Sequence, residues 1–462
     1  MFVRLLLFLM LCSPLVGRVQ DLYKQHCMTC HGSELNRGLG GSLLKTDWKH
    51  LASDNDLQSF IASGNQRIGM PAFSDKLSEK EIRSLVIYIQ EQRKSAAPAP
   101  ITNSTLGNSI HSEEESFKIE RICSDLKTPW SMAFLPEGGF LVSERSGRLR
   151  MFHKGELSKP ISGIPKVWAE VQGGLLEIAL HPNYPENKWV YLTFSEKPEQ
   201  TKGDPNGGSL KIIRGRIENL KWVDQETIFE VSESFYTNRP FHFGTRLAFK
   251  GDYLFFSIGD RGVQENAQRL DNPYGKIHRI HLDGSIPKDN PFVTDANAIP
   301  SIWSYGNRNP QGLDFHPIRG QLWESEHGPR GGDEINIIKK GKNYGWPLVT
   351  YGMNYNGTPI TSKTEADGII DPLHYWVPSI ATCGIDFYEG APFPNWQNDL
   401  FVAGLVTQEL RRLKIEDGKI LSDEVILKNL GRVRDVASGP DGFLYVILND
   451  PGQIIRLVPS TR

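Results

Sequence analysis

The stretch GLDFHPIRGQLWESE, residues 312–326, contains the unit from which most of this chain is built. An apolar run, a turn with Pro317 and Gly320, and a second apolar run predict two antiparallel strands, because proline and glycine favour turns. Five related stretches repeat this order, at residues 131–144, 177–196, 246–260, 384–404 and 435–450. The copies begin roughly 45 to 70 residues apart, as expected for a repeat architecture with long loops.

Each copy alternates apolar and polar residues, so one hairpin cannot bury its own apolar face. Six hairpins around a common axis can, whereas the alternative is a β-sandwich of similar hairpins. The 44 glycines and 29 prolines agree with a turn-rich β architecture. We therefore predict an all-β six-bladed β-propeller domain over residues 117–462.

The N-terminal part has a different pattern. Residues 20–94 contain two stretches with helical periodicity, 54–61 and 78–92, and Ser78 with Glu81 forms a capping-box sequence at the start of the second. Residues 95–116 are rich in Ala, Pro, Ser and acidic residues without apolar periodicity, which predicts a linker.

Residues 1–18 have the pattern of an export signal, with Arg4 before the apolar run Leu5–Leu11. No later segment has the length and apolarity of a membrane helix, so we expect a periplasmic protein that is not integral to the membrane. The 52 basic and 54 acidic side chains give a net charge of −2, which excludes the basic excess of a nucleic-acid-binding protein.

Cys27, Cys30 and His31 form a Cys-x-x-Cys-His motif. Zinc needs about four ligands, and no second cysteine pair lies nearby. A thioredoxin-like redox pair needs a βαβ context, which is absent. Covalent attachment of haem c requires this order, because two thiols bond the porphyrin and the following histidine ligates the iron.

Met70, in IGMPAF, is the candidate second iron ligand, since Gly69 and Pro71 form a loop that can direct its thioether inward. A core methionine is the alternative. With the helix at 78–92, residues 20–94 resemble a class I c-type cytochrome, so we expect a small all-α cytochrome c domain.

Several polar stretches of the propeller, above all YGNRNPQG (305–312) and EHGPRGGDEIN (326–336), resemble the soluble pyrroloquinoline quinone (PQQ)-dependent sugar dehydrogenases, in particular the aldose sugar dehydrogenases. The resemblance runs from about Lys118 to the C-terminus, and it also implies a six-bladed propeller. PQQ is a tricarboxylated quinone, and arginines give planar bidentate contacts to carboxylates. The candidate PQQ-binding residues are Gln172, Arg308, Asn309, Tyr355, Arg432 and Arg434. Surface salt bridges are the alternative role for the arginines.

Calcium prefers oxygen ligands, including backbone carbonyls. The resemblance places a cofactor-bound calcium at Gly328 and Pro329, and a second, structural calcium near Glu334 and Tyr344. It also singles out His242, among 12 histidines, as the base that removes the hydroxyl proton.

Two positions depart from the family pattern. Phe241 stands where glucose-oxidising relatives carry an acidic residue. Val406 stands where relatives place a lysine against the quinone, which implies either weaker cofactor binding or substitution by Arg411 or Arg412.

These features predict an enzyme that oxidises aldose sugars at C1 and passes electrons through its haem to a soluble cytochrome or membrane oxidase. Two alternatives remain. The substrate could be another alcohol, a polyol or an aldehyde hydrate, or the propeller could be a non-catalytic binding module. Cys123 and Cys383 could form a disulfide or be two small buried hydrophobic residues.

Overall fold

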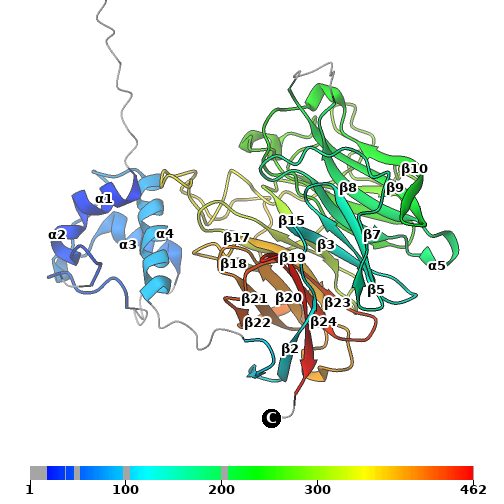
Figure 1. The fold of residues 1–462 in the computed structure, drawn as a ribbon. Coiled ribbons are helices and arrows are strands. Elements are labelled where there is room, and N and C mark those ends of the chain that lie inside the picture. Colours follow the sequence, from blue (N-terminus) through cyan, green and yellow to red (C-terminus); the bar gives the residue numbers. More distant parts are fainter. Residues whose placement is uncertain (1–17, 37, 46–52, 97–104, 199–205, 461–462) are drawn as a thin grey trace, which may run out of the picture. The chain divides into compact units, whose positions relative to one another are not determined.

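The computed structural model describes residues 18–36, 38–45, 53–96, 105–198 and 206–460 and divides the chain into two compact units (Figure 1). The first unit contains Met1–Ala97 and Gly352–Ser362, and the second contains Pro98–Tyr351 and Lys363–Arg462. Apart from residue 18, the expected export signal lies outside the described residues. In the described part of the chain, no helix is both long and apolar enough to cross a membrane.

The first unit is helical, as predicted. Its elements are α1 (Val19–His26), α2 (Met28–His31), α3 (Asp54–Ser63), the 3₁₀ helix η1 (Gln66–Ile68) and α4 (Glu79–Ala96). α4 packs against α1 and α3. Ser78 and Glu81 exchange side-chain to backbone hydrogen bonds at the start of α4, which confirms the capping box. The apolar face of α4, with Leu85 and Val86 fully buried, therefore forms the centre of this unit.

The second unit is a ring of six antiparallel sheets, which confirms the predicted propeller. The first three sheets in the chain are β3 (Pro129–Phe134), β4 (Phe140–Glu144), β5 (Arg148–His153) and β6 (Glu156–Leu157); β7 (Leu175–Leu180), β8 (Val190–Glu196), β9 (Ser209–Glu218) and β10 (Lys221–Glu230); and β11 (Leu247–Lys250), β12 (Tyr253–Ile258), β13 (Lys276–His281) and β14 (Ile302–Tyr305). The next two are β15 (Pro310–Phe315), β16 (Leu322–Glu326), β17 (Asp333–Ile338) and β18 (His374–Trp376); and β19 (Thr382–Phe387), β20 (Leu400–Gly404), β21 (Glu409–Glu416) and β22 (Lys419–Lys428). The sixth joins both ends of the unit: β23 (Arg432–Ser438), β24 (Leu444–Asp450), β25 (Gln453–Pro459), β2 (Ser116–Cys123) and β1 (Ser109–His111).

The ring is closed in two ways. The first strands of successive sheets, β3, β7, β11, β15, β19 and β23, contact one another in order, and β23 contacts β3. β2, from the start of the unit, pairs with β25, from the end of the chain. Each of the six sequence repeats supplies the first two strands of one sheet, so the repeat count and the sheet count agree.

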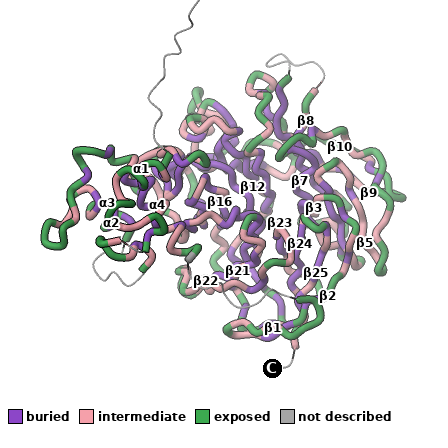
Figure 2. Tube along the Cα trace, turned by 60° about the vertical axis from the view of Figure 1, so that its left-hand side comes forward, coloured by how far each residue is buried: buried purple, intermediate pink, exposed green. Residues whose placement is uncertain are grey.

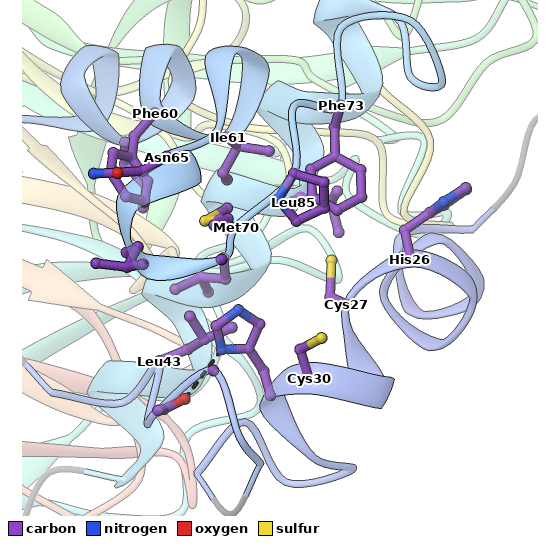
Figure 3. Close-up of a pocket in the computed structure, with 18 of the residues that line it drawn as sticks. His26, Cys27, Cys30, Leu43, Phe60, Ile61, Asn65, Met70, Phe73 and Leu85 are labelled. Atoms are coloured by element: carbon purple, nitrogen blue, oxygen red, sulfur yellow. Dashed lines mark hydrogen bonds between the residues drawn. The ribbon is translucent and has the colours of Figure 1, made fainter.

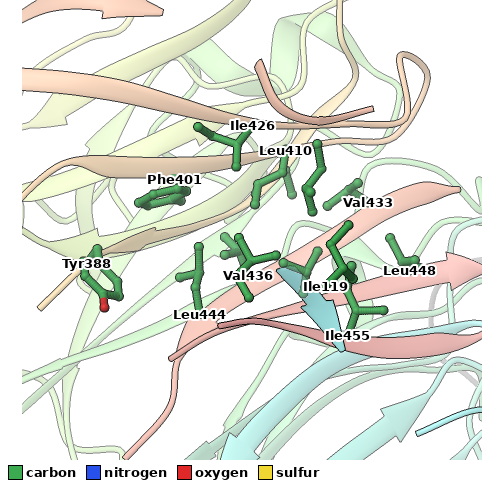
Figure 4. Close-up of a cluster of buried hydrophobic side chains, with 14 of the residues drawn as sticks. Ile119, Tyr388, Phe401, Leu410, Ile426, Val433, Val436, Leu444, Leu448 and Ile455 are labelled. Atoms are coloured by element: carbon green, nitrogen blue, oxygen red, sulfur yellow. The ribbon is translucent and has the colours of Figure 1, made fainter. Parts of the chain in front are cut away.

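The core lies between neighbouring sheets, where the strands are mostly buried (Figure 2). Figure 4 shows one such cluster, in which Phe401 and Leu410 of one sheet meet Val436 and Leu444 of the next. These side chains are fully or almost fully buried, and truncating one to alanine typically costs about 2–5 kcal/mol. The apolar positions of the repeat therefore hold the ring together and leave its loops available for chemistry.

Cys123 and Cys383 are buried, and both thiols are free. The interpretation of these two cysteines as small buried hydrophobic residues is confirmed.

Candidate functional site

The helical unit contains a cavity of about 800 Å³ (Figure 3). Cys27, Cys30 and His31, at α2, and Met70, after η1, all line it. The rest of the lining is mostly apolar and includes Leu43, Leu57, Phe60, Ile61, Phe73, Leu85 and Ile89. This size and apolar character suit a cofactor.

The local structure around His31 fits haem ligation. Its Nδ1 lies 3.0 Å from the carbonyl oxygen of Gly41, so Nδ1–H donates to that carbonyl and Nε2 remains available for iron. A Cβ atom at Gly40 would lie 2.8 Å from Cε1 of His31, and one at Gly38 would lie 1.9 Å from the carbonyl oxygen of Cys30. The loop after the motif therefore needs glycine to approach it.

The zinc alternative finds no support in the same geometry. In the described part of the chain, no group of three or more His, Cys, Asp or Glu is placed to hold a metal ion. Burial and the neighbouring Cys30 raise the pKa of Cys27 to about 11, so this thiol is protonated at neutral pH.

In the propeller, His242 precedes β11 and is paired with Asp260, which follows β12. His242 Nδ1 lies 2.6 Å from Oδ1 of Asp260. The same carboxylate accepts the backbone N–H of Gly262 at 2.7 Å and the indole N–H of Trp346 at 2.8 Å. Because Asp260 is fully buried and fixed by these donors, it holds the His242 ring with a proton on Nδ1 and leaves Nε2 as an acceptor.

The electrostatics favour a neutral imidazole beside a charged carboxylate. Burial and the charge of Arg308 lower the pKa of His242, although Asp260 acts in the opposite direction. Burial alone would raise the pKa of Asp260, but its hydrogen bond to His242 and the charge of Arg308 hold it below the usual value. A partly buried neutral imidazole with Nε2 available as an acceptor is suited to general-base catalysis.

Two of the expected PQQ-binding residues hold the backbone around His242, and a third, Arg434, is linked to it through Gln311. Gln172 Oε1 accepts the His242 N–H at 2.7 Å, and Asn309 Oδ1 accepts the Gly244 N–H at 3.2 Å. Gln311 links Gly244 to Arg434, because its Nε2 donates to the Gly244 carbonyl at 2.6 Å and its Oε1 accepts from Arg434 at 3.1 Å. Gln172, Asn309 and Arg434 thus gather around His242 from three different sheets.

Arg308 joins this group to the predicted calcium position. Its Nη1 donates to the carbonyl oxygens of His327 at 2.6 Å and Gly328 at 2.7 Å. Two carbonyls that converge on one cationic nitrogen are oxygen donors of the kind that calcium prefers. Pro329 follows Gly328 in the chain and is buried. Arg432 is the first residue of β23. Burial is the main cause that lowers the pKa of Arg434, and the charge of Arg432 lowers it further.

Other expected residues are less directly connected. Burial and the charge of Glu326 raise the pKa of Glu334 well above its usual value, so this carboxylate lies in an acidic environment. The Tyr344 hydroxyl donates to the Ile337 carbonyl at 2.6 Å, and the role of Tyr344 at a structural calcium stays a prediction. Tyr355 belongs to the first unit and is 66% exposed, so its role beside the quinone stays a prediction.

Comparison with known proteins identifies the propeller. The model of the family Glucose / Sorbosone dehydrogenase matches residues 126–456. The chain belongs to this family. A second model, Cytochrome C oxidase, cbb3-type, subunit III, matches residues 15–89.

Aldose sugar dehydrogenase YliI of Escherichia coli is 40% identical over 363 residues, which cover 77% of this chain and 96% of that relative. Quinoprotein glucose dehydrogenase B of Acinetobacter calcoaceticus is 28% identical over 440 residues, covering 78% and 90%. Among solved structures, the apo-form of the E. coli aldose sugar dehydrogenase has a TM-score of 0.70 at 39% identity and covers 74% of this chain and 100% of that chain. The PQQ-bound enzyme of Streptomyces coelicolor has a TM-score of 0.59 at 25% identity, covering 74% and 98%.

The Glucose / Sorbosone dehydrogenase family and the cytochrome c domain were both expected from the sequence and are confirmed. The chain is an oxidoreductase of the PQQ type that carries a haem-binding domain.

One expectation about this dehydrogenase is wrong. Arg411 and Arg412 do not replace the missing lysine near Val406, because both are held by carboxylates of their own sheet. Arg411 lies 2.6 Å from Asp423, and Arg412, which is fully buried, lies 2.9 Å from Asp399. Val406 is 63% exposed between β20 and β21.

Sequence reasoning missed Asp260, Gln311 and Trp346. Asp260 is the last residue of the repeat at 246–260, and a carboxylate at the end of a buried strand was the available signal. Gln311 lies inside the YGNRNPQG block, in which only Arg308 and Asn309 were predicted to bind the cofactor. No sequence pattern pointed to Trp346, because only the folded loop brings its indole to Asp260.

Proposed function

We propose that this chain oxidises aldose sugars at the C1 hydroxyl in the periplasm and transfers the electrons to a haem in its own helical unit. The observation that carries the proposal is the His242–Asp260 pair, which lies among the candidate cofactor residues of a sugar dehydrogenase family. The periplasmic location rests on the sequence of residues 1–18.

The reaction begins with a proton transfer for which the chain is prepared. His242 Nε2 accepts the proton of the sugar hydroxyl as hydride leaves the carbon that bears this hydroxyl. Asp260, hydrogen-bonded to Nδ1–H, stabilises the imidazolium that forms and keeps the ring in place. PQQ, when bound, supplies the two-electron acceptor for the hydride.

The residues present fit this cofactor. Arg308, which is buried, and Arg434, which is partly buried, are cations that match the carboxylates of PQQ, and Asn309 and Gln172 offer amide groups beside them. The resemblance implies that Gly328 and Pro329 would hold a calcium ion, which when bound would polarise an oxygen of the cofactor. In this structure the Gly328 carbonyl accepts a hydrogen bond from Arg308.

The helical unit would hold haem through Cys27, Cys30, His31 and Met70. Haem, when bound, supplies a one-electron carrier. Because both units belong to one chain, the effective concentration of haem relative to the propeller is roughly millimolar. A soluble cytochrome or membrane oxidase is the proposed final acceptor.

Phe241 favours a second candidate for the substrate. This residue directly precedes His242 and is 42% exposed, so the surface beside the base is partly apolar. A less polar alcohol or an aldehyde hydrate is therefore the alternative substrate. A non-catalytic binding module has no need for a neutral imidazole held by a buried carboxylate.

The proposal is tested by loading the full-length haem protein with calcium and PQQ and following haem reduction spectroscopically. We expect an aldose to reduce the haem and its alditol, which lacks the anomeric hydroxyl, not to reduce it. Reduction by less polar alcohols or aldehyde hydrates alone would support the second candidate. No reduction by any sugar or alcohol, with PQQ shown to be bound, would contradict both.

A further inference from the structure

Arg261 is a buried cation that the proposed chemistry does not use. The residue is fully buried and has no carboxylate at ion-pair distance within the described ranges, although the Tyr274 hydroxyl and the Asp260 charge lie near enough to oppose the effect of burial on its pKa. Its Nε has no hydrogen-bond partner there. Burial lowers its pKa to about 10, so the guanidinium stays charged at neutral pH. Burying an unpaired charge is costly, so its presence needs a reason.

The guanidinium holds the segment that leads into His242. Nη1 donates to the Phe241 carbonyl at 2.8 Å, and Nη2 donates to the Arg239 carbonyl at 2.5 Å. The same group lies over the ring of Phe243, with its central carbon 3.5 Å from the ring centroid. Arg261 thus contacts the residues on both sides of His242.

Contacts also run in the opposite direction. Arg239 Nη1 donates to the Gly262 carbonyl at 2.8 Å, and His242 Nδ1 is bonded to Asp260. Residues 239–243 and 260–262 are therefore joined by the side chains of both segments.

The backbone shows why such support is needed. His242 has φ 49° and Arg261 has φ 60°, and residues with a Cβ rarely adopt this left-handed region. Such conformations persist where surrounding contacts fix them, and they cluster at functional sites.

We propose that Arg261 is a positioning residue. Its guanidinium fixes residues 239–243 through the hydrogen bonds of its two terminal nitrogens to the Phe241 and Arg239 carbonyls, and so holds the His242 ring in the orientation that catalysis needs. The proposal rests on the proposed function of His242 as the base. Lysine cannot replace the planar fork, because an ammonium is a compact point charge.

The test uses the full-length holoenzyme with two substitutions. We expect Arg261→Met to lower kcat about tenfold to a hundredfold, the loss expected when a reacting group is displaced by about 1 Å. It should also move the acid limb of the pH–rate profile to higher pH. The charged groups that face His242 are Asp260, Arg308 and Arg261, and His327 is a neutral titratable neighbour, because burial lowers its pKa to about 3. Arg261 is therefore one of the cations that keep the His242 ring neutral.

Arg261→Lys keeps the charge and loses the fork. This variant should leave the acid limb in place and still lower kcat, with little change in KM. Arg279→Met is the matched control, because Arg279 is another buried arginine, is stacked on Trp303 and bonded to Asn290, and touches none of the site residues. It should leave kcat and the acid limb unchanged.

A second readout does not depend on turnover. Histidine-selective NMR of the full chain, with His242 assigned by its loss in His242→Asn, should show its titration at higher pH in Arg261→Met than in wild type. Wild-type kcat and wild-type His242 titration in Arg261→Met would overturn the proposal. If that variant does not fold, wild-type kcat in Arg261→Lys would overturn it. The role of His242 as the base is tested separately: if His242→Asn retained activity, that role would be wrong.

Discussion

The two candidate cofactor sites of this chain are built in opposite ways. The haem cavity is mostly apolar, and Cys27, Cys30 and His31 lie within five consecutive residues, between the end of α1 and the end of α2. The propeller site is polar and charged, and its residues extend from Gln172 to Arg434 across loops of different sheets. Covalent attachment needs fixed local spacing, whereas a site at the end of a propeller is assembled only when the ring closes.

The strongest way to separate the two sites is to remove the local one. Cys27→Ser with Cys30→Ser should abolish covalent haem completely, because both thioether bonds are lost. The propeller should still oxidise sugar when a soluble dye replaces haem as the acceptor. Haem-stain electrophoresis and a dye-reduction assay measure the two effects, and loss of dye reduction in a folded double variant would show that the sites are not independent.

A single substitution in the propeller site should have a smaller but still large effect. Asp260→Asn should lower kcat about tenfold to a hundredfold, since the amide no longer fixes the His242 tautomer or stabilises the imidazolium. Steady-state kinetics with saturating PQQ and calcium measure this loss. Asp271→Asn is the control, because Asp271 is an exposed partner of Arg269. Equal kcat in Asp260→Asn and wild type would contradict the role of the pair.

Replacing the candidate second iron ligand, Met70, should have a moderate effect on the haem site. Met70→Leu should keep haem attached through the cysteines but lower its reduction potential, because a thioether ligand raises that potential. Sugar-driven haem reduction should slow several-fold. Redox titration and the sulfur-to-iron absorption band measure the change, and a retained band would exclude Met70 as the ligand.

The smallest expected effect concerns pH. His242 acts as a base only when neutral, and its pKa lies below the usual 6.5 because of burial and Arg308. Activity should therefore be constant above that value and fall only as pH decreases through the lowered pKa. A pH profile of kcat/KM measures the acid limb, and a midpoint at or above 6.5 would contradict the electrostatic account.

The same contrast explains what could be predicted from the sequence. The hairpin repeats follow from local alternation, and the haem motif from local spacing, so the fold and the haem residues were identified. His242 and Arg308 came from a family resemblance. Asp260 and Trp346 were missed because they are far apart in the sequence and meet only in the folded ring. The suggested roles of Arg411 and Arg412 were wrong, because sequence does not show that Asp423 and Asp399 already neutralise them.

Single-turnover haem reduction in His242→Asn tests the central claim most directly. Full-length wild type and variant, with equal haem and PQQ content, are mixed with an aldose, and the rate of haem reduction is recorded. His181→Asn, in the turn between β7 and β8, serves as the control. The account predicts that His242→Asn reduces its haem about 10² to 10⁴ times more slowly than wild type, while His181→Asn matches wild type. Haem reduction at the wild-type rate in His242→Asn would contradict it.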